Sequence, residues 1–271
     1  MTPRHALLVL IAVAQREVEK FVRQGGRFFS ALVRPLLWLV VFAAGFQNVF
    51  GVSIIPPYET YIPYQVYIVP GLLGMTLLFN GMQSSLAMVY DREMGMMRLL
   101  LTAPVPRSFL LFAKLMAGTL LSVLQAIAFL AIALLMGVDL PLIGCLTALP
   151  ALVLSGMMLG ALGLLLSVHV KQLENFAGTM NFVIFPMFFI SPALYPLWKL
   201  EESGAEWLHK LAQLNPFSHG VELVRFALYG QVEWTALAVV GGSLLVFFAL
   251  AVRGYNPQRG LARQGGKPGA D

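Results

Sequence analysis

The chain has 271 residues, of which 58% are hydrophobic and only 11% are charged, and its formal net charge is +5. An average soluble domain carries about a quarter of its residues as charged side chains, so this composition excludes an ordinary soluble domain and indicates a membrane protein. The single cysteine, Cys145, also excludes a disulfide framework and a paired-cysteine metal site.

A basic amphipathic helix is predicted at the start of the chain, over residues 5–23. Leu7, Ile11 and Ala14 fall on one face of this helix, and Arg16 and Lys20 fall on another. A helix of this kind lies along the membrane surface. The alternative is a signal peptide, but cleavage near residue 14 would leave basic residues outside the membrane just before a span, against the charge rule.

Six apolar segments approach the roughly 20 residues that a helix needs to cross a hydrocarbon core. They are continuous and rich in Leu, Ala, Val and Phe, unlike the short alternating strands of a transmembrane barrel. We therefore predict an all-α polytopic membrane protein with one transmembrane domain, residues 1–253, and a polar cytoplasmic tail, residues 254–271. The six predicted spans are 29–50, 66–90, 108–137, 143–168, 176–198 and 232–253.

The distribution of basic residues predicts the orientation of these spans. Fifteen of the eighteen lysines and arginines fall in the N-terminal segment, between residues 92 and 114, at Lys171 or near the C-terminus. Short cytoplasmic loops carry the excess of Lys and Arg, so both termini and segment 91–106 are expected in the cytoplasm. Topology accounts for the positive net charge, and no nucleic-acid partner is predicted.

Segment 91–106 brings four charges together, on Asp91, Arg92, Glu93 and Arg98. Each would cost about 2.5–3.5 kcal/mol at the centre of the membrane, so the segment must lie outside the hydrocarbon core. The residues alone leave two interpretations. The segment is either a loop that only fixes topology, or a rigid handle through which a cytoplasmic partner tilts the flanking spans.

A second distinctive segment, residues 201–229, lies between the last two spans on the external side. It contains two weakly amphipathic pieces, 201–213 and 217–229, which are separated by Asn215 and Pro216. Neither piece is long enough to span the membrane. We therefore predict two short re-entrant helices that dip into the outer leaflet and are broken at the proline.

Catalytic motifs are absent from the sequence. It contains no GxxxxGK[ST] phosphate loop, no HExxH and no GxSxG, so the chain is not expected to hydrolyse ATP by itself or to act as a protease or serine hydrolase. Every Asp and Glu lies at or beyond a predicted span end, which disfavours a proton-coupled transporter. The absence of fixed charge inside the predicted spans favours an uncharged or amphipathic cargo.

Residues 90–115 resemble the cytoplasmic coupling segment of ABC type-2 exporter permeases. The resemblance is carried by Glu93-x-Gly95, the leucines that follow, Ala103-Pro104-Val105 and Lys114. Met96 and Met97 stand where that family commonly has a hydroxyl residue and then an acid. The resemblance implies that an ATPase is contacted by Asp91, Arg92, Glu93, Gly95, Arg98, Leu99, Leu100 and Pro104.

The external segment contains a second match, LNPFSHGVELVRFALYG, which is similar to the family's signature before the last span. That signature is carried here by Asn215, Pro216, Arg225 and Gly230. The family also has six spans, cytoplasmic termini, an N-terminal interfacial helix and two short external helices. The resemblance therefore covers nearly the whole chain.

The resemblance further implies that two permease subunits face each other and enclose a path with their first, second and fifth spans. The candidate lining residues are Gln47, Asn48, Asn80, Gln83, Ser84, Thr179, Asn181 and Phe185. The other interpretation is that the polar side chains hydrogen-bond to neighbouring helices, at about 0.6 kcal/mol each. The phenylalanines of the fifth span could equally be packing residues or an amphiphile-binding wall.

By resemblance, the chain is the membrane subunit of an ATP-binding cassette exporter in the bacterial inner membrane. The expected cargo is a drug-like compound, a lipid-linked molecule or a polysaccharide. The expected partners are two copies of a cytoplasmic ABC ATPase, a second permease subunit in a homodimer, and membrane lipid. ATP and magnesium would bind to the ATPase, with no cofactor on this chain. Two alternatives stay open: an ATP-independent carrier or channel, and a membrane scaffold without transport.

Overall fold

The computed structural model describes residues 3–23, 25–46, 56–93, 105–170 and 172–255. Every regular element in these ranges is a helix, which confirms the all-α prediction. In chain order the helices are α1 (Pro3–Arg23), α2 (Gly25–Phe46), α3 (Tyr64–Glu93), α5 (Arg107–Leu135), α6 (Leu142–Thr147), α7 (Leu149–His169), α8 (Leu173–Phe189), α9 (Trp198–Glu202), α10 (Glu206–Leu214), α11 (Pro216–Ala227) and α12 (Trp234–Gly254).

Several of these helices are apolar enough for a membrane interior. Within the described ranges, four segments are long and apolar enough to cross it: Tyr64–Tyr90, Arg107–Leu135, Leu142–His169 and Trp234–Gly254. α2 contains a shorter apolar stretch, Ala31–Phe42, and α8 has 17 residues. The total of six spans therefore stays a prediction.

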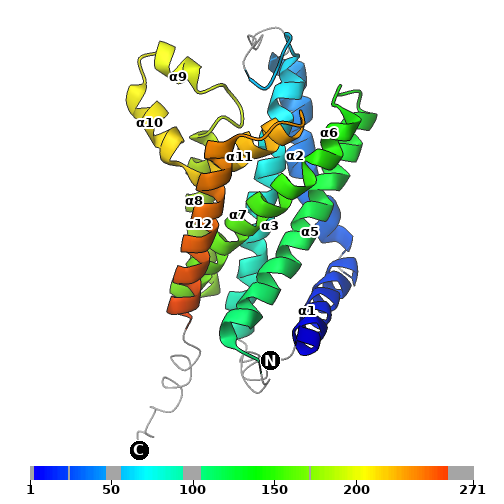
Figure 1. Ribbon diagram of the computed structural model, residues 1–271, viewed down its shortest axis with the longest axis vertical. Coiled ribbons are helices and arrows are strands. Elements are labelled where there is room, and N and C mark those ends of the chain that lie inside the picture. The colour runs from blue at the N-terminus through cyan, green and yellow to red at the C-terminus, as the bar shows by residue number, and fades with distance from the viewer. Residues whose placement is uncertain (1–2, 24, 47–55, 94–104, 171, 256–271) are drawn as a thin grey trace, which may run out of the picture.

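The helices form an elongated bundle with two different ends (Figure 1). The lower end in that view holds α1, the end of α3 and the start of α5, and the upper end holds α6, α9, α10 and α11. α1 packs against α5 and exposes the apolar side chains of Leu7, Leu8 and Ile11. α10 ends at Leu214 and α11 begins at Pro216, so the break between them lies at Asn215.

α3 is the central helix of the bundle. From Val66 to Phe79 its side chains are buried on every face, and Leu72, Leu73, Leu77 and Leu78 have no exposed surface. It packs against α2, α5, α7, α8 and α11. Because α3 is in contact with five other helices, a displacement of α3 has to move several of its neighbours.

The closest approach of α3 to α7 depends on glycine. A Cβ atom at Gly81 would lie 3.0 Å from the backbone nitrogen of Gly160, and one at Gly163 would lie 2.9 Å from the carbonyl oxygen of Gly81. Small residues let the backbones of membrane helices come this close. The α3–α7 crossing is therefore incompatible with larger side chains at these positions.

α8 ends at Phe189, whereas the sequence predicts the fifth span to continue to residue 198. Pro192 gives the physical reason, since a proline disfavours helical geometry in the residue before it. That residue, Ser191, donates a hydrogen bond from its Oγ to the carbonyl oxygen of Phe188 at 2.6 Å, and it accepts one from the backbone N–H of Ala193 at 3.3 Å. The chain therefore turns at Ser191 instead of continuing as a helix.

Gly81→Leu is expected to destabilise the bundle, because the atoms nearest to the new side chain are backbone atoms that cannot rotate away. Overpacking of this kind costs about 1–3 kcal/mol, and each kcal/mol lowers the melting temperature by roughly 2–4 °C. Thermal unfolding of the purified protein in detergent measures the effect. Gly242→Leu on α12 is the matched control, since a Cβ there meets nothing within 4 Å. Equal melting temperatures for the two variants would contradict the close crossing.

Candidate functional site

The sequence-predicted site residues fall at three levels of the bundle. Asp91, Arg92 and Glu93 of the coupling set end α3 at the lower end, the external signature belongs to the upper end, and the described path residues lie between. α3 extends to Glu93 and so contains Asp91 and Arg92 as well. Gly95, Arg98, Leu99, Leu100 and Pro104 lie outside the described residues, as do Gln47 and Asn48 of the candidate path.

The lower end is formed by two helices that are longer than a membrane requires. α3 has 30 residues and α5 has 29, which correspond to about 45 Å and 43 Å at 1.5 Å per residue. A hydrocarbon core is about 30 Å thick. Both helices are therefore longer than the core is thick, and they pack against each other.

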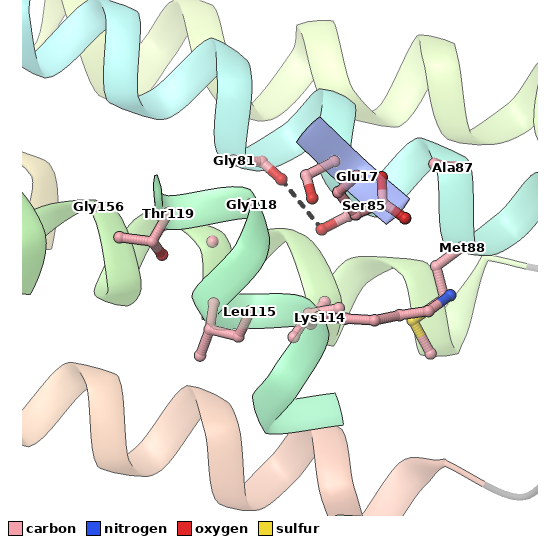
Figure 2. A pocket seen from close by; sticks show the side chains of 13 residues that line it. Glu17, Gly81, Ser85, Ala87, Met88, Lys114, Leu115, Gly118, Thr119 and Gly156 are labelled. Carbon is pink, nitrogen blue, oxygen red and sulfur yellow. Dashed lines mark hydrogen bonds between the residues drawn. The ribbon is translucent and has the colours of Figure 1, made fainter. Parts of the chain in front are cut away.

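A small cavity opens near this end between α1, α3, α5 and α7 (Figure 2). It is lined by Glu17, Ser84, Lys114 and Thr119, among others, and has a volume of about 20 Å³. That is room for about one water molecule. Ser84 borders this cavity and is exposed, and its place on a cargo path stays a prediction.

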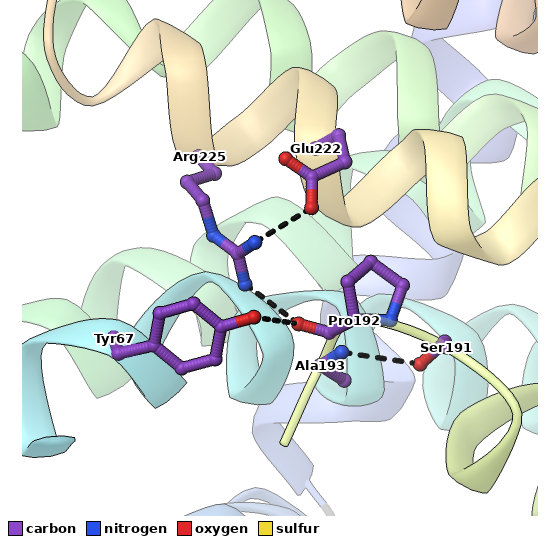
Figure 3. A network of polar contacts seen from close by, with 6 residues as sticks. All are labelled: Tyr67, Ser191, Pro192, Ala193, Glu222 and Arg225. Carbon is purple, nitrogen blue, oxygen red and sulfur yellow. Dashed lines mark hydrogen bonds and ion pairs between the residues drawn. The ribbon is translucent and has the colours of Figure 1, made fainter. Parts of the chain in front are cut away.

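Arg225 is the centre of a buried polar network at the upper end (Figure 3). Its Nη1 donates to Oε1 of Glu222 and its Nη2 donates to the carbonyl oxygen of Pro192, both at 2.6 Å. The hydroxyl of Tyr67 donates to the same carbonyl oxygen at 3.0 Å. The guanidinium carbon lies 4.2 Å from the centre of the Tyr67 ring. Arg225 therefore joins α11 to α3 and to the turn after α8.

Asn215 makes a second connection between the same segments. Its Oδ1 accepts from the backbone N–H of Phe217 at 3.1 Å and so caps α11, while its Nδ2 donates to the carbonyl oxygens of Met187 and Ile190, each at 2.7 Å. Pro216 is the first residue of α11, a position at which a missing N–H costs nothing. Gly230 has φ of +67°, which glycine adopts without strain.

The electrostatics of this upper network follow from its burial. Arg225 is 2% exposed, whereas a quarter of the Glu222 side chain is exposed. Desolvation raises the pKa of Glu222, and the neighbouring Arg225 opposes that shift. Desolvation also raises the pKa of Tyr58, which packs edge-on against Tyr229. The hydroxyl of Tyr58 therefore stays protonated, and Arg225 and Glu222 form an ion pair within the network.

The remaining path residues divide into two kinds. Asn80 donates to Gln125 of α5, and Thr179 donates to the carbonyl oxygen of Asn175 at 2.8 Å, so these two side chains form bonds inside the protein. Asn181 and Phe185 are instead exposed on α8. The contacts of Phe185 are with Phe79 and Phe189.

Arg34 on α2 is not among the predicted site residues, although it counts among the basic residues of the N-terminal segment. It lies inside the apolar stretch Ala31–Phe42 of α2 and within the predicted first span, 29–50, and its side chain is exposed on the bundle. The signal was present in the sequence as one arginine within an apolar run. Such a charge costs about 2.5–3.5 kcal/mol at a membrane centre on insertion scales, so its surroundings have to offset part of that cost.

Those surroundings are a polar cavity between α2 and α3. The cavity has a volume of about 130 Å³ and is lined by Arg34, Thr76, Phe79, Asn80 and Gln83, among others. The guanidinium carbon of Arg34 lies 3.8 Å from the centre of the Phe79 ring. Gln83 of the candidate path is thus brought next to Arg34, which is on a different helix.

Comparison with known proteins places this architecture in one family. The family model for the ABC-2 type transporter matches residues 9–229, which include α3, α5, α11 and the segment 91–106. The chain belongs to the ABC-2 type transporter family. It is a membrane transport permease by this membership, and the family is one of transporters, not of enzymes.

Individual relatives agree with this assignment. The chain is 30% identical to the protein of Pyropia yezoensis named transport permease ycf38, over 85% of this chain and 77% of the relative. It is 23% identical to the daunorubicin resistance ABC transporter permease protein DrrB1 of Streptomyces coeruleorubidus, over 84% of this chain and 79% of that one. The inner membrane transport permease YadH of Escherichia coli (strain K12) is also 23% identical, over 89% of this chain and 90% of that one.

Arg225→Met is expected to lower stability, because it leaves Glu222 and the Pro192 carbonyl oxygen without the group that pairs with both. Removing one member of a buried ion pair costs up to about 3–5 kcal/mol, and less here because Glu222 is partly exposed. Thermal unfolding in detergent measures the loss.

The double variant Arg225→Met, Glu222→Gln should recover part of that loss, since it leaves no unpaired carboxylate. Arg253→Met, at the exposed end of α12, is the matched control for loss of an arginine. If Arg225→Met melted at the same temperature as Arg253→Met, the network would not be holding α11 to α3.

Proposed function

We propose that this permease is the membrane subunit of an ATP-driven exporter that moves an amphipathic or hydrophobic cargo. One observation carries the proposal: α3 and α5 pack against each other, extend from the lower end, and are joined by the charged segment 91–106. A protein that binds this segment would displace α3, and the buried surface of α3 passes that displacement to its neighbours. ABC-2 membership supplies the class of partner, an ABC ATPase.

The proposed topology has six spans with the lower end in the cytoplasm. α2 and α8 supply the two spans beyond the four longest apolar segments, with 22 and 17 residues, or about 33 Å and 26 Å. The excess of basic residues at both termini and around segment 91–106 supports this orientation. α1 would then lie on the cytoplasmic surface, and α9 to α11 would enter the outer leaflet of the bacterial inner membrane.

A homodimer is proposed from the contrast between α8 and α12. The exposed surface of α12 includes the apolar side chains of Leu245, Val246 and Leu250, as a lipid-facing helix requires. α8 exposes Asn175 and Asn181 beside its phenylalanines. Exposed amides are unfavourable against lipid and favourable against another protein or a polar path, so α8 is proposed to face a second copy of the chain.

ATP and magnesium are proposed to bind to the partner ATPase, two copies of which would serve the dimer, and no cofactor is proposed for this chain. The second candidate is an ATP-independent carrier or channel, and the third is a scaffold without transport. Binding of an ATPase to segment 91–106 distinguishes the exporter from both, because neither alternative needs that partner.

The full-length protein, tagged and purified from its own membranes, is expected to retain an ABC ATPase in a stoichiometric amount. Glu93→Ala should weaken this association, and Glu93→Ala with Gly95→Pro should abolish it, because the segment loses a charge and its backbone conformation. Mass spectrometry identifies the partner, and ATP hydrolysis by the complex measures coupling. Glu202→Ala, an exposed acid at the upper end, is the control. Folded wild type that retains no ATPase would overturn the exporter proposal.

Cysteine cross-linking tests the proposed dimer face. In a Cys145→Ser background, Asn181→Cys is expected to give a disulfide-linked dimer in the membrane under mild oxidation. Leu245→Cys on α12, where the native side chain is 71% exposed, should remain monomeric because that face meets lipid. Gel electrophoresis without reductant separates the two species. Cross-linking at residue 245 but not at residue 181 would move the interface to α12.

A further inference from the structure

The cavity between α2 and α3 is lined, among the described residues, by a positively charged side chain and by no carboxylate. Arg34 makes no ion pair within the part of the chain that the structure describes, and its recorded contact is with the Phe79 ring. The Gln83 side chain also has no recorded hydrogen-bond partner in the described ranges. Arg34 contributes a full positive charge and several N–H donors, so the cavity has a net capacity to bind an anion.

The other polar side chains of the cavity are already engaged. Thr76 donates from its Oγ1 to the carbonyl oxygen of Leu72 at 2.9 Å, and Asn80 donates to Gln125. The cavity lining includes no carboxylate. Arg34 and Gln83, which come from α2 and α3, are therefore the two polar side chains of the lining with no hydrogen bond or ion pair recorded in the described part of the chain.

A continuous aromatic surface leads away from this cavity. Phe79 meets Phe185 of α8 edge to face with ring centres 6.4 Å apart, and Phe185 stacks on Phe189 at 6.3 Å. Phe185 is 46% exposed and Phe189 is 43% exposed. Trp38 of α2 is the last ring of this surface, and its ring centre lies 6.0 Å from that of Phe189. An apolar chain could lie along these rings while a charged head group occupies the cavity.

We infer that the cavity around Arg34 and Gln83 binds the anionic head group, phosphate or carboxylate, of an amphipathic cargo whose apolar chain lies along Phe185 and Phe189. The inference rests on the proposed function and narrows its cargo to an amphiphile with a negative charge. The guanidinium of Arg34 pairs with the anion, and the Gln83 amide donates a further hydrogen bond to it. Arg34 is thus a specificity-determining residue for the transport reaction.

The test measures binding to the chain alone, in nanodiscs of phosphatidylcholine, with radiolabelled dodecyl phosphate as the probe and empty nanodiscs as the blank. Arg34→Gln is expected to weaken binding by at least about tenfold, as loss of a charge-assisted contact implies. Gln83→Leu should have a smaller effect, and Arg34→Lys should retain part of the affinity. Arg253→Gln, which removes a charge outside the cavity, should bind as wild type does.

Two results would overturn the inference: equal affinity of wild type and Arg34→Gln, or equal losses from Arg34→Gln and Arg253→Gln. A melting temperature like that of wild type shows that Arg34→Gln is folded.

A second set of nanodiscs contains a minority of phosphatidylglycerol. Dodecyl phosphate binding that survives there supports a cargo site, whereas its complete displacement would assign the cavity to bilayer lipid and overturn the cargo inference. No ATPase is present, so failure here is distinct from failure of the exporter proposal.

Discussion

The hydrogen bonds that Arg225 and its neighbours make to backbone carbonyl groups are the constraint on which the upper half of this bundle depends. α8 stops at Phe189, and the chain then turns without helical bonds. In lipid each carbonyl group without a partner costs several kcal/mol. Here the carbonyl oxygens of Ile190, Pro192 and Leu194 accept from Asn215, Arg225 and Tyr64. The turn is therefore possible only because α11 lies across it and the start of α3 lies beside it.

That dependence has a mechanical consequence for the proposed function. α3 is bonded to the turn at the upper end through Tyr64 and Tyr67, and it reaches segment 91–106 at the lower end. Tight glycine crossings hold it against α7 along its middle. Because a close-packed interior has little space to absorb a displacement, a tilt imposed at the lower end of α3 is expected to shift the upper turn and α8. The exposed face of α8, where Asn181 and Phe185 lie, would move with it.

Local patterns in the sequence predict much of this fold, and contacts between distant segments explain the rest. Proline and the short amphipathic pieces place the break at Asn215, because their effect on the backbone is local. The sequence does not predict the end of α8, because the apolar run continues past it. The groups that stabilise the turn lie 125 and 130 residues away along the chain, on Tyr67 and Tyr64. Arg225 is singled out only by family resemblance. Arg34 is visible as a charge, but its cavity exists only where α2 packs on α3.

The position of Arg34 over an aromatic ring suits a site that must release what it binds. A cation over a ring gains about 0.5–1 kcal/mol at exposed sites and about 2 kcal/mol when desolvated, whereas a hydrogen bond to a charged group contributes about 1.5–3 kcal/mol. The contact with Phe79 therefore stabilises the charge of Arg34. A bound anion would stabilise that charge by only slightly more than the ring does. A carboxylate from the protein in place of Phe79 would compete too strongly for any anionic cargo. Arg34 is exposed and meets the Phe79 ring on one side, so the inferred site keeps its guanidinium accessible to an anion without first breaking an ion pair.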